Sequence, residues 1–288
     1  MRIILLICML STLACHTGRK STKVSEKKDA LLWRISGKGA NPSYLYGTIH
    51  IICAEEFSIS DSLESAMERA GKLYLELDMD DPMMMLKTAQ LSMLKDGSIK
   101  ELAGKERFEK LEKFMKDSIG VPTVLFNRMK PFALMSLMYS KIPGCSRTES
   151  YELKLVEMAK KGKREVVGLE TVEEQFAVFD RIPDSTEVRI IMDMIDDFEG
   201  QRKQFAEMTQ LYRKRDLDGL GALIRSSPGM AGMEDVMLVD RNKRWIPIME
   251  KAMSKDAVVF AVGAGHLPGE EGVIRLLRKA GYKVEPVE

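Results

Sequence analysis

The feature that most constrains the fold is a set of short apolar segments separated by helical patterns. Residues 31–47 predict two strands around a Gly/Asn/Pro turn. Residues 58–72 predict a helix, with Ser60 or Asp61 as its cap, and residues 72–80 predict a buried strand. The opening order is therefore strand, helix, strand, which favours an α/β fold with parallel strands.

The same alternation returns later in the chain. Residues 149–163 predict a helix, residues 164–170 a strand, and residues 171–182 a helix that opens with a Thr171 to Glu174 capping box. The last segment, 256–287, predicts strand, turn, helix and strand. We therefore expect a mixed, mainly parallel central sheet flanked by helices.

Between these units the pattern is helical. From about residue 81 to residue 145 only helices are predicted, with a kink or break at Pro131, and we interpret this stretch as a helical insertion. Residues 184–216 predict one long helix or two, with Gly200 as the candidate break, and more helix follows in residues 233–255.

The N-terminal residues resemble an export signal. Residues 1–15 carry one positive residue, an apolar run and small residues before Cys15, which is too short for a membrane span. Cys15 would be the lipidated residue of a lipoprotein, although Thr12 stands where that pattern prefers Leu, so simple secretion is the alternative. Residues 16–30 read as a flexible tether and residues 31–288 as the folded domain. We therefore expect a protein exported to the cell envelope.

Composition excludes one class of partner and leaves a second question open. Lys and Arg total 44 against 43 Asp and Glu, so no basic field favours nucleic acid. The 21 methionines are unusual, and we interpret them as core filling rather than a ligand surface. In an exported protein Cys53 and Cys145 could form a disulfide, and the sequence leaves open whether they meet.

Both histidines of the predicted domain lie in the same local setting. His50 in "YLYGTIH" and His266 in "VFAVGAGH" each follow an apolar strand in a G-x-x-H motif, after Gly47 and Gly263 respectively. A glycine at a strand exit permits a sharp turn beside the next side chain, and Gly265 adds further freedom. The carboxyl edge of an open α/β sheet is where ligands bind, and imidazole is a common metal ligand. Two histidines that merely complete turns are the alternative.

Carboxylates follow two further predicted strands. Glu76 and Asp78 end one strand, and Glu170 ends another. An acid at the end of an apolar strand is costly to bury unless it is paired or bound to a metal. Two histidines and two or three carboxylates at one edge favour a metal-dependent hydrolase. The alternatives are that Glu170 only favours the next helix N-terminus and that Asp78 is solvated.

At these residues the sequence resembles the TraB/PrgY/GumN family, which includes the Tiki metalloproteases and is distantly similar to erythromycin-esterase and ChaN-like proteins. The resemblance rests on "YLYGTIHI", "YLELDMD", "VVGLETVEEQ", "VDRNKRW" and the closing "VFAVGAGHLPGEEGVIRLLRKAGYKVEPV". It covers nearly the whole chain after the tether. The sequence departs from the family where an Asp often precedes "GLET", since Glu149 and Glu152 stand there instead.

The resemblance implies a metal-dependent hydrolase fold that uses both G-x-x-H motifs, Glu76 and Glu170. It also implies a role for the Arg241–Asn242 pair, in which Arg241 could steady a carboxylate or an oxyanion. We expect a divalent metal ion (zinc, manganese or cobalt) at His50, His266 and Glu170.

In this hypothesis Glu76 accepts the proton of water as an amide or ester bond is cleaved, and the roles of the two glutamates remain interchangeable. The expected partner is a peptide or a small-molecule substrate, and the only expected membrane contact is the lipid anchor. The alternative is a non-catalytic envelope module that binds haem or a peptide signal at the same site. Sequence does not specify the oligomeric state.

Overall fold

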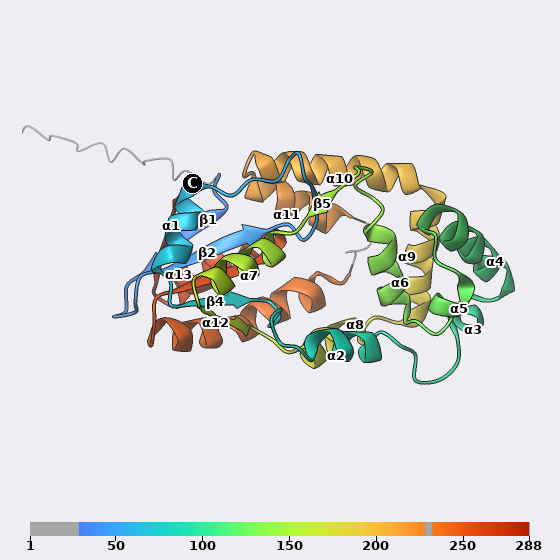
Figure 1. Ribbon diagram of the computed structural model, residues 1–288, viewed down its shortest axis with the longest axis horizontal. Coiled ribbons are helices and arrows are strands. Elements are labelled where there is room, and N and C mark those ends of the chain that lie inside the picture. The colour runs from blue at the N-terminus through green and yellow to red at the C-terminus, as the bar shows by residue number, and fades with distance from the viewer. Residues whose placement is uncertain (1–28, 228–231, 288) are drawn as a thin grey trace, which may run out of the picture.

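The computed structural model describes residues 29–227 and 232–287, and its core is one six-stranded sheet (Figure 1). The strand order is β6-β4-β7-β2-β1-β8. The strands span Leu32–Ser36 (β1), Ser43–Thr48 (β2), Lys72–Leu75 (β4), Glu165–Gly168 (β6), Val258–Gly263 (β7) and Lys283–Pro286 (β8). The β4–β6, β4–β7 and β2–β7 pairs are parallel, whereas β1 pairs antiparallel with β2 and β8. The expected α/β fold with a mixed, mostly parallel sheet is confirmed.

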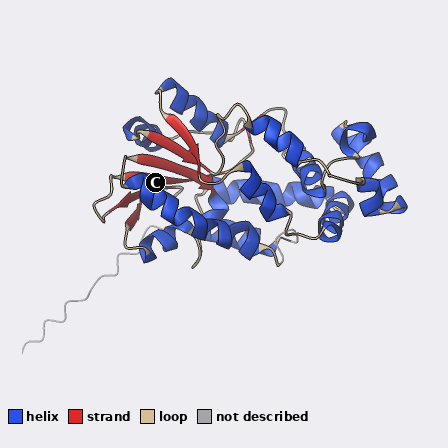
Figure 2. Ribbon diagram, turned by 90° about the horizontal axis from the view of Figure 1, so that it is seen from below, coloured by secondary structure: helices blue, strands red, loops and turns tan. Residues whose placement is uncertain are grey.

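Helices cover both faces of this sheet (Figure 2). The flanking helices are α1 (Asp61–Arg69), α7 (Tyr151–Lys161), α12 (Asp240–Met253) and α13 (Val273–Lys279). The connections through α1 and α7 both move along the sheet towards β6, so right-handed crossovers place these two helices on one face. Helices α12 and α13 pack against each other on the other face. Valines and Phe260 of β7, the strand between β4 and β2, are fully buried because both faces are covered.

A second apolar core lies in a helical lobe beside the sheet, at the right of Figure 1. Its helices include α3 (Ile99–Ala103), α4 (Lys105–Phe114), the π-helix η1 (Met115–Ile119), α5 (Thr123–Phe126) and α6 (Pro131–Tyr139). Pro131 stands at the first position of α6, which explains the break expected there. The core of this lobe also contains Val188 and Ile191 from α9 (Asp184–Asp196), so the lobe extends beyond residues 81–145.

The helices that follow β6 connect the lobe back to the sheet. They are α8 (Val172–Phe179), α9, α10 (Phe198–Arg213), α11 (Leu217–Ser226) and the π-helix η2 (Asp235–Val239), which continues into α12. Thr171 and Glu174 form the expected capping box at α8. The break expected at Gly200 is wrong: α10 begins after Asp197, whose side chain accepts a hydrogen bond from the Gly200 N–H. A side-chain cap at Asp197 therefore decides the boundary, and Gly200 lies in the first turn.

Two smaller features lie between the sheet and the lobe. Helix α2 (Met84–Leu91) packs against α8, and strands β3 (Ile52–Cys53) and β5 (Thr148–Glu149) form a two-stranded sheet. Cys53, the last residue of β3, forms a disulfide with Cys145, and their Cα atoms are 5.9 Å apart. The disulfide links the end of the lobe to the first G-x-x-H segment.

The export signal, Cys15 and all but the last residues of the tether lie outside the described residues. Within residues 29–227 and 232–287, none of the helices combines the length and the apolar character that a membrane crossing needs.

Candidate active site

The residues singled out in the sequence meet at the carboxyl ends of the parallel strands. Strand β2 ends at Thr48, two residues before His50, and β4 ends at Leu75, directly before Glu76. Glu170 follows β6, and the short 3-10 helix η3 (Ala264–His266), which contains Gly265 and His266, follows β7. This edge is the usual ligand site of open α/β sheets.

Arg241 of α12 enters this group from the side and binds two carboxylates. Its side chain is buried, and its Nη2 donates to Glu76 Oε2 and to Glu170 Oε1, both at 2.6 Å. Its Nε donates to Glu170 Oε1 at 3.1 Å. Gln175 of α8 donates a further hydrogen bond to Glu170 Oε1 at 3.1 Å. Glu170, which is also buried, is therefore committed to Arg241 in this structure.

Glu76 lies between Arg241 and the turn after β7. Its Oε1 accepts a hydrogen bond from the Gly263 N–H at 2.8 Å, and its Oε2 accepts the bond from Arg241. Burial by itself would raise the pKa of Glu76, but the charge of Arg241, helped by the charge of His50 and the Gly263 hydrogen bond, holds that pKa well below its ordinary value. Glu76 is therefore an ionised carboxylate at neutral pH.

His266 is buried and held in one orientation. Its Nδ1 donates to Asn242 Oδ1 at 2.6 Å, and its Nε2 accepts from Arg241 Nη1 at 3.2 Å. Asn242 is in turn fixed, because its amide donates to the carbonyl oxygens of His266 and Glu271. Burial, reinforced by the Arg241 charge, lowers the pKa of His266 to about 3. The imidazole is therefore neutral, and its Nε2 carries a lone pair.

His50 lies on the solvent-exposed side of the site, and 70% of its side chain is exposed. Its Nδ1 is 2.8 Å from Glu152 Oε1, and the Thr48 hydroxyl donates to the same oxygen at 2.6 Å. The Ser150 hydroxyl donates to Glu152 Oε2 at 2.8 Å. Burial by itself would lower the pKa of His50, but the hydrogen bond and charge of Glu152 raise that pKa to about 9. Because most of the His50 side chain is exposed, solvent screens the Glu152 charge and makes this rise in pKa smaller.

The two histidines and Glu76 converge on the Cα atom of Gly263. A Cβ atom placed there would lie 3.3 Å from Glu76 Oε1, 3.7 Å from His50 Nε2 and 3.7 Å from His266 Cδ2. Any side chain at this position would fill the space between the three groups. Gly47 has a packing role instead, because a Cβ there would lie 3.2 Å from the Ala264 backbone.

This space offers donor atoms of the kinds that a divalent metal ion takes. His50 Nε2, His266 Nε2 and Glu76 Oε1 would be two imidazole nitrogens and a carboxylate oxygen, a common catalytic set. Each imidazole has its Nδ1 bound to a second acceptor, as metal-binding histidines usually do. His266 Nε2 and Glu76 Oε1 are 3.8 Å apart.

The spacing shown here is not yet that of a metal centre. Among the residues that the structure describes, no three His, Cys, Asp or Glu side chains already gather as a metal-binding group. The Arg241 guanidinium also donates to the His266 nitrogen that a metal would need. The donors therefore fit a metal in kind. For the metal to bind, Arg241 must release His266, and His50, whose pKa is raised to about 9, must lose its proton.

Sequence reasoning missed the partner of His50. Glu152 lies where the sequence departs from the family pattern, so the resemblance assigns it no role. The structure places it in the first turn of α7, with its carboxylate turned towards His50 and Thr48. Only the local signal of a Ser150 helix cap, which fixes where α7 begins, could have indicated which way this carboxylate points.

Comparison with known proteins gives a family and distant relatives. The model of the TraB/PrgY/gumN family matches residues 31–286. The chain is 22% identical to metalloprotease TIKI1 of Danio rerio over 93% of this chain and 65% of that protein. It is 22% identical to metalloprotease TIKI2 of Danio rerio and 24% identical to TIKI2 of Xenopus tropicalis, over 94% and 91% of this chain and 64% and 61% of those proteins.

The chain thus spans less than two thirds of the length of these curated relatives. No solved structure matches the chain.

Proposed function

This chain belongs to the TraB/PrgY/gumN family, and we propose that it is a metal-dependent hydrolase that cleaves amide or ester bonds. The observation that carries the proposal is the convergence of His50, His266 and Glu76 on the space beside Gly263. The names of the distant relatives, which are metalloproteases, support the same class of reaction.

In this proposal His50 Nε2, His266 Nε2 and Glu76 Oε1 would hold the metal ion, whether zinc, manganese or cobalt. A bound divalent ion lowers the pKa of water and polarises a carbonyl. We assign the ligand role to Glu76 rather than to Glu170, because Glu76 Oε1 lies beside the imidazoles and Glu170 is committed to Arg241. Glu170 then anchors Arg241.

Other residues of the site orient these donors. Glu152 and Thr48 hold the His50 ring, and Asn242 fixes the His266 tautomer. Arg241 holds the Glu76 carboxylate and keeps it ionised. In the proposed reaction its guanidinium would help to stabilise an oxyanion that forms at the site.

Solvent reaches the site from the side of His50, so we propose that the substrate enters there. A peptide or another small molecule with an accessible carbonyl fits such an open site, and nucleic acid does not follow from the nearly balanced charge of the chain. We further propose that the protein is exported, with or without a lipid at Cys15. The Cys53–Cys145 disulfide supports an oxidising compartment.

One observation favours a second candidate, a non-catalytic envelope module that binds haem or a peptide signal. Arg241 occupies the Nε2 atom of His266, so the imidazole is not free for a metal in this structure. In such a module the carboxylates would serve only to hold Arg241 in place.

The Glu76→Gln variant separates the two candidates. The variant and the parent chain are compared for hydrolysis of a library of peptides and esters with each metal added. Glu173→Gln, an exposed change in the first turn of α8, is the matched control. The hydrolase proposal expects activity in the parent and the control and at least a hundredfold loss in Glu76→Gln. Equal hydrolysis in all three, or none in the parent with every metal, would overturn it.

A further inference from the structure

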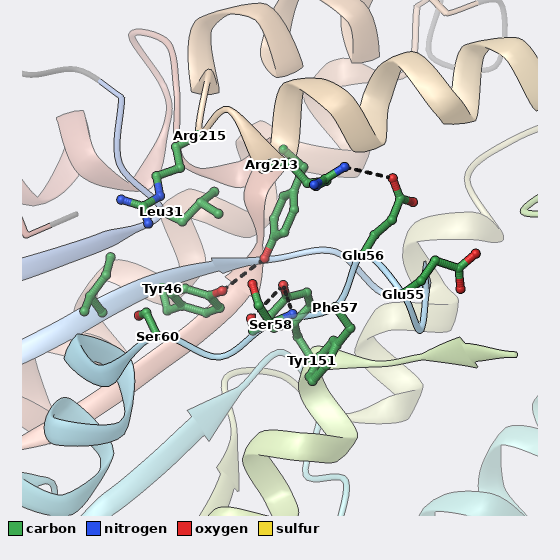
Figure 3. A pocket seen from close by; sticks show the side chains of 12 residues that line it. Leu31, Tyr46, Glu55, Glu56, Phe57, Ser58, Ser60, Tyr151, Arg213 and Arg215 are labelled. Atoms are coloured by element: carbon green, nitrogen blue, oxygen red, sulfur yellow. Dashed lines mark hydrogen bonds and ion pairs between the residues drawn. The ribbon is translucent and has the colours of Figure 1, made fainter.

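A cavity of about 340 Å³ lies near the candidate active site, on the side where α10 and α7 meet β2 (Figure 3). This volume is at the lower end of the range of about 300–1,000 Å³ that is typical of small-molecule sites. Its wall includes Tyr46 of β2, Tyr151 of α7 and Tyr212 of α10. The cavity is therefore built from elements that are far apart in the sequence.

The wall of the cavity is an aromatic cluster. The Tyr151 ring lies 4.6 Å from the ring of Phe57, 5.5 Å from that of Tyr212 and 5.9 Å from that of Tyr46, measured between centroids. The Tyr212 hydroxyl donates to the Gly47 carbonyl at 3.0 Å and lies 3.2 Å from the Tyr46 hydroxyl. These contacts fix the rings, which are themselves nearly buried, so the cavity is preformed and the surface that it exposes is mostly polar.

The charged side chains at the rim of the cavity differ in whether they are already paired within the protein. Arg213 is paired with Glu56 at 3.3 Å, so these two charges offset each other. Glu55 is exposed, and Figure 3 shows its carboxylate on the far side from Arg215. Arg215 is half-buried beside Leu31, and no residue in 29–227 or 232–287 forms an ion pair or hydrogen bond with its guanidinium. On the side of the cavity beside Leu31, the charge left for a ligand is therefore positive.

Arg215 also stands at a backbone position where glycine is the favoured residue. Its φ is +62°, in the left-handed region. The Arg215 N–H donates to the Tyr212 carbonyl and the Asp216 N–H donates to the Leu211 carbonyl, which is the Schellman pattern at the end of α10. A non-glycine residue pays a conformational cost at this position. An arginine here thus costs stability, and its side chain lines a cavity.

We propose that this cavity binds a small ligand that carries a carboxylate on an aromatic body. The Arg215 guanidinium would hold the carboxylate, since planar guanidinium and carboxylate groups form paired hydrogen bonds. The body of the ligand would lie against the exposed ring edges and hydroxyl groups of Tyr46, Tyr151 and Tyr212. The carboxylate can come from the C-terminus of a peptide or from a free organic acid.

The cavity shares structure with the candidate active site. Tyr212 bonds the carbonyl of Gly47, the first residue of the G-x-x-H motif that carries His50. Tyr151 directly precedes Glu152, which binds His50. The proposal does not depend on hydrolysis, because it concerns binding at a separate group of residues.

The test is calorimetric titration of the full chain with matched probes. N-acetyl-phenylalanine and 3-phenylpropionate carry the carboxylate, as a peptide-like and a free organic acid respectively, and N-acetyl-phenylalanine amide lacks it. We expect at least one acid to bind at least tenfold more tightly than the amide. Which acid binds more tightly identifies the source. If neither acid binds at millimolar concentration, or if acid and amide bind equally, the proposal is overturned.

Two variants locate the binding. Arg215→Gly removes the guanidinium and relieves the left-handed backbone, so its melting temperature should equal or exceed that of the parent while acid binding falls at least tenfold. Lys163→Gly is the matched control, because Lys163 is an exposed residue with φ +54° after α7, outside the cavity. It should keep acid binding unchanged. Parent-like acid binding by Arg215→Gly would overturn the proposal.

Discussion

Glu187 of α9 should make the stability of this protein fall as pH rises, and the variant Glu187→Gln should remove that fall. The Glu187 side chain is buried, with 3% of the residue exposed, and its Oε1 atom has no hydrogen-bond partner among the described residues. Burial, helped by the neighbouring charge of Asp184, raises its pKa from 4.5 to about 7. The backbone of Phe132 and the charge of Lys130 oppose this rise without cancelling it.

The direction of the change in stability follows from whether the Glu187 carboxyl binds a proton in the folded and in the unfolded chain. Below pH 4.5 the carboxyl is protonated in the folded and the unfolded chain, so it has no effect on the free energy of unfolding. Between pH 4.5 and about 7 the unfolded chain has lost this proton while the folded chain keeps it, so stability falls. The difference between the two pKa values, at about 1.4 kcal/mol per unit, corresponds to a loss of about 3 kcal/mol. Above pH 7 the loss is complete and constant.

Gln has nearly the same shape as Glu and carries no charge at any pH. We therefore expect Glu187→Gln to match the parent at pH 4 and to exceed it by up to about 3 kcal/mol at pH 8. Urea unfolding of both chains at several pH values measures this difference. Glu207→Gln, an exposed change on α10, is the control and should give a small difference at every pH. A difference between Glu187→Gln and the parent that does not change with pH would refute the reasoning.

Three further predictions concern the site and its surroundings. Arg241→Met should lower the free energy of unfolding by about 3–5 kcal/mol, because two buried carboxylates lose their partner. Urea titrations measure this loss, and an unchanged unfolding midpoint would contradict the prediction. Glu152→Gln should lower the pKa of His50 from about 9 towards its ordinary value. NMR titration of the metal-free protein measures this pKa, and an unchanged pKa of His50 would contradict the assigned contact. Reduction of the Cys53–Cys145 disulfide should cost up to about 4.6 kcal/mol, since the bond joins residues 92 apart in the sequence. Equal unfolding midpoints with and without reductant would contradict this.

The elements of the sheet could be predicted from the sequence because their signals are local. Strands end where an apolar run meets a glycine or an acid, and the Thr171 capping box is complete within four residues. Residues that follow parallel strands must lie at one edge of the sheet, so grouping His50 with Glu76 and His266 needed only the strand order. The break before α10 was misplaced because a glycine signal competed with the Asp197 cap three residues earlier.

The pairings within the site could not be predicted in the same way. Glu152 is 102 residues from His50, and Arg241 is 71 residues from Glu170. Such contacts depend on how α7 and α12 pack on the sheet, and a rotation of either helix would redirect its side chains. The sequence therefore identified Glu170 as acidic and near the site, while only the structure shows that Arg241 takes its carboxylate.

The central claim is that His50, His266 and Glu76 form a metal site, and the most direct test is the binding of divalent ions. The full chain and the double variant His50→Ala/His266→Ala would be titrated with zinc, manganese and cobalt, with circular dichroism to verify that both are folded. The account predicts one tightly bound ion per parent chain and its loss in the double variant. A folded parent chain that binds none of the three ions would contradict it.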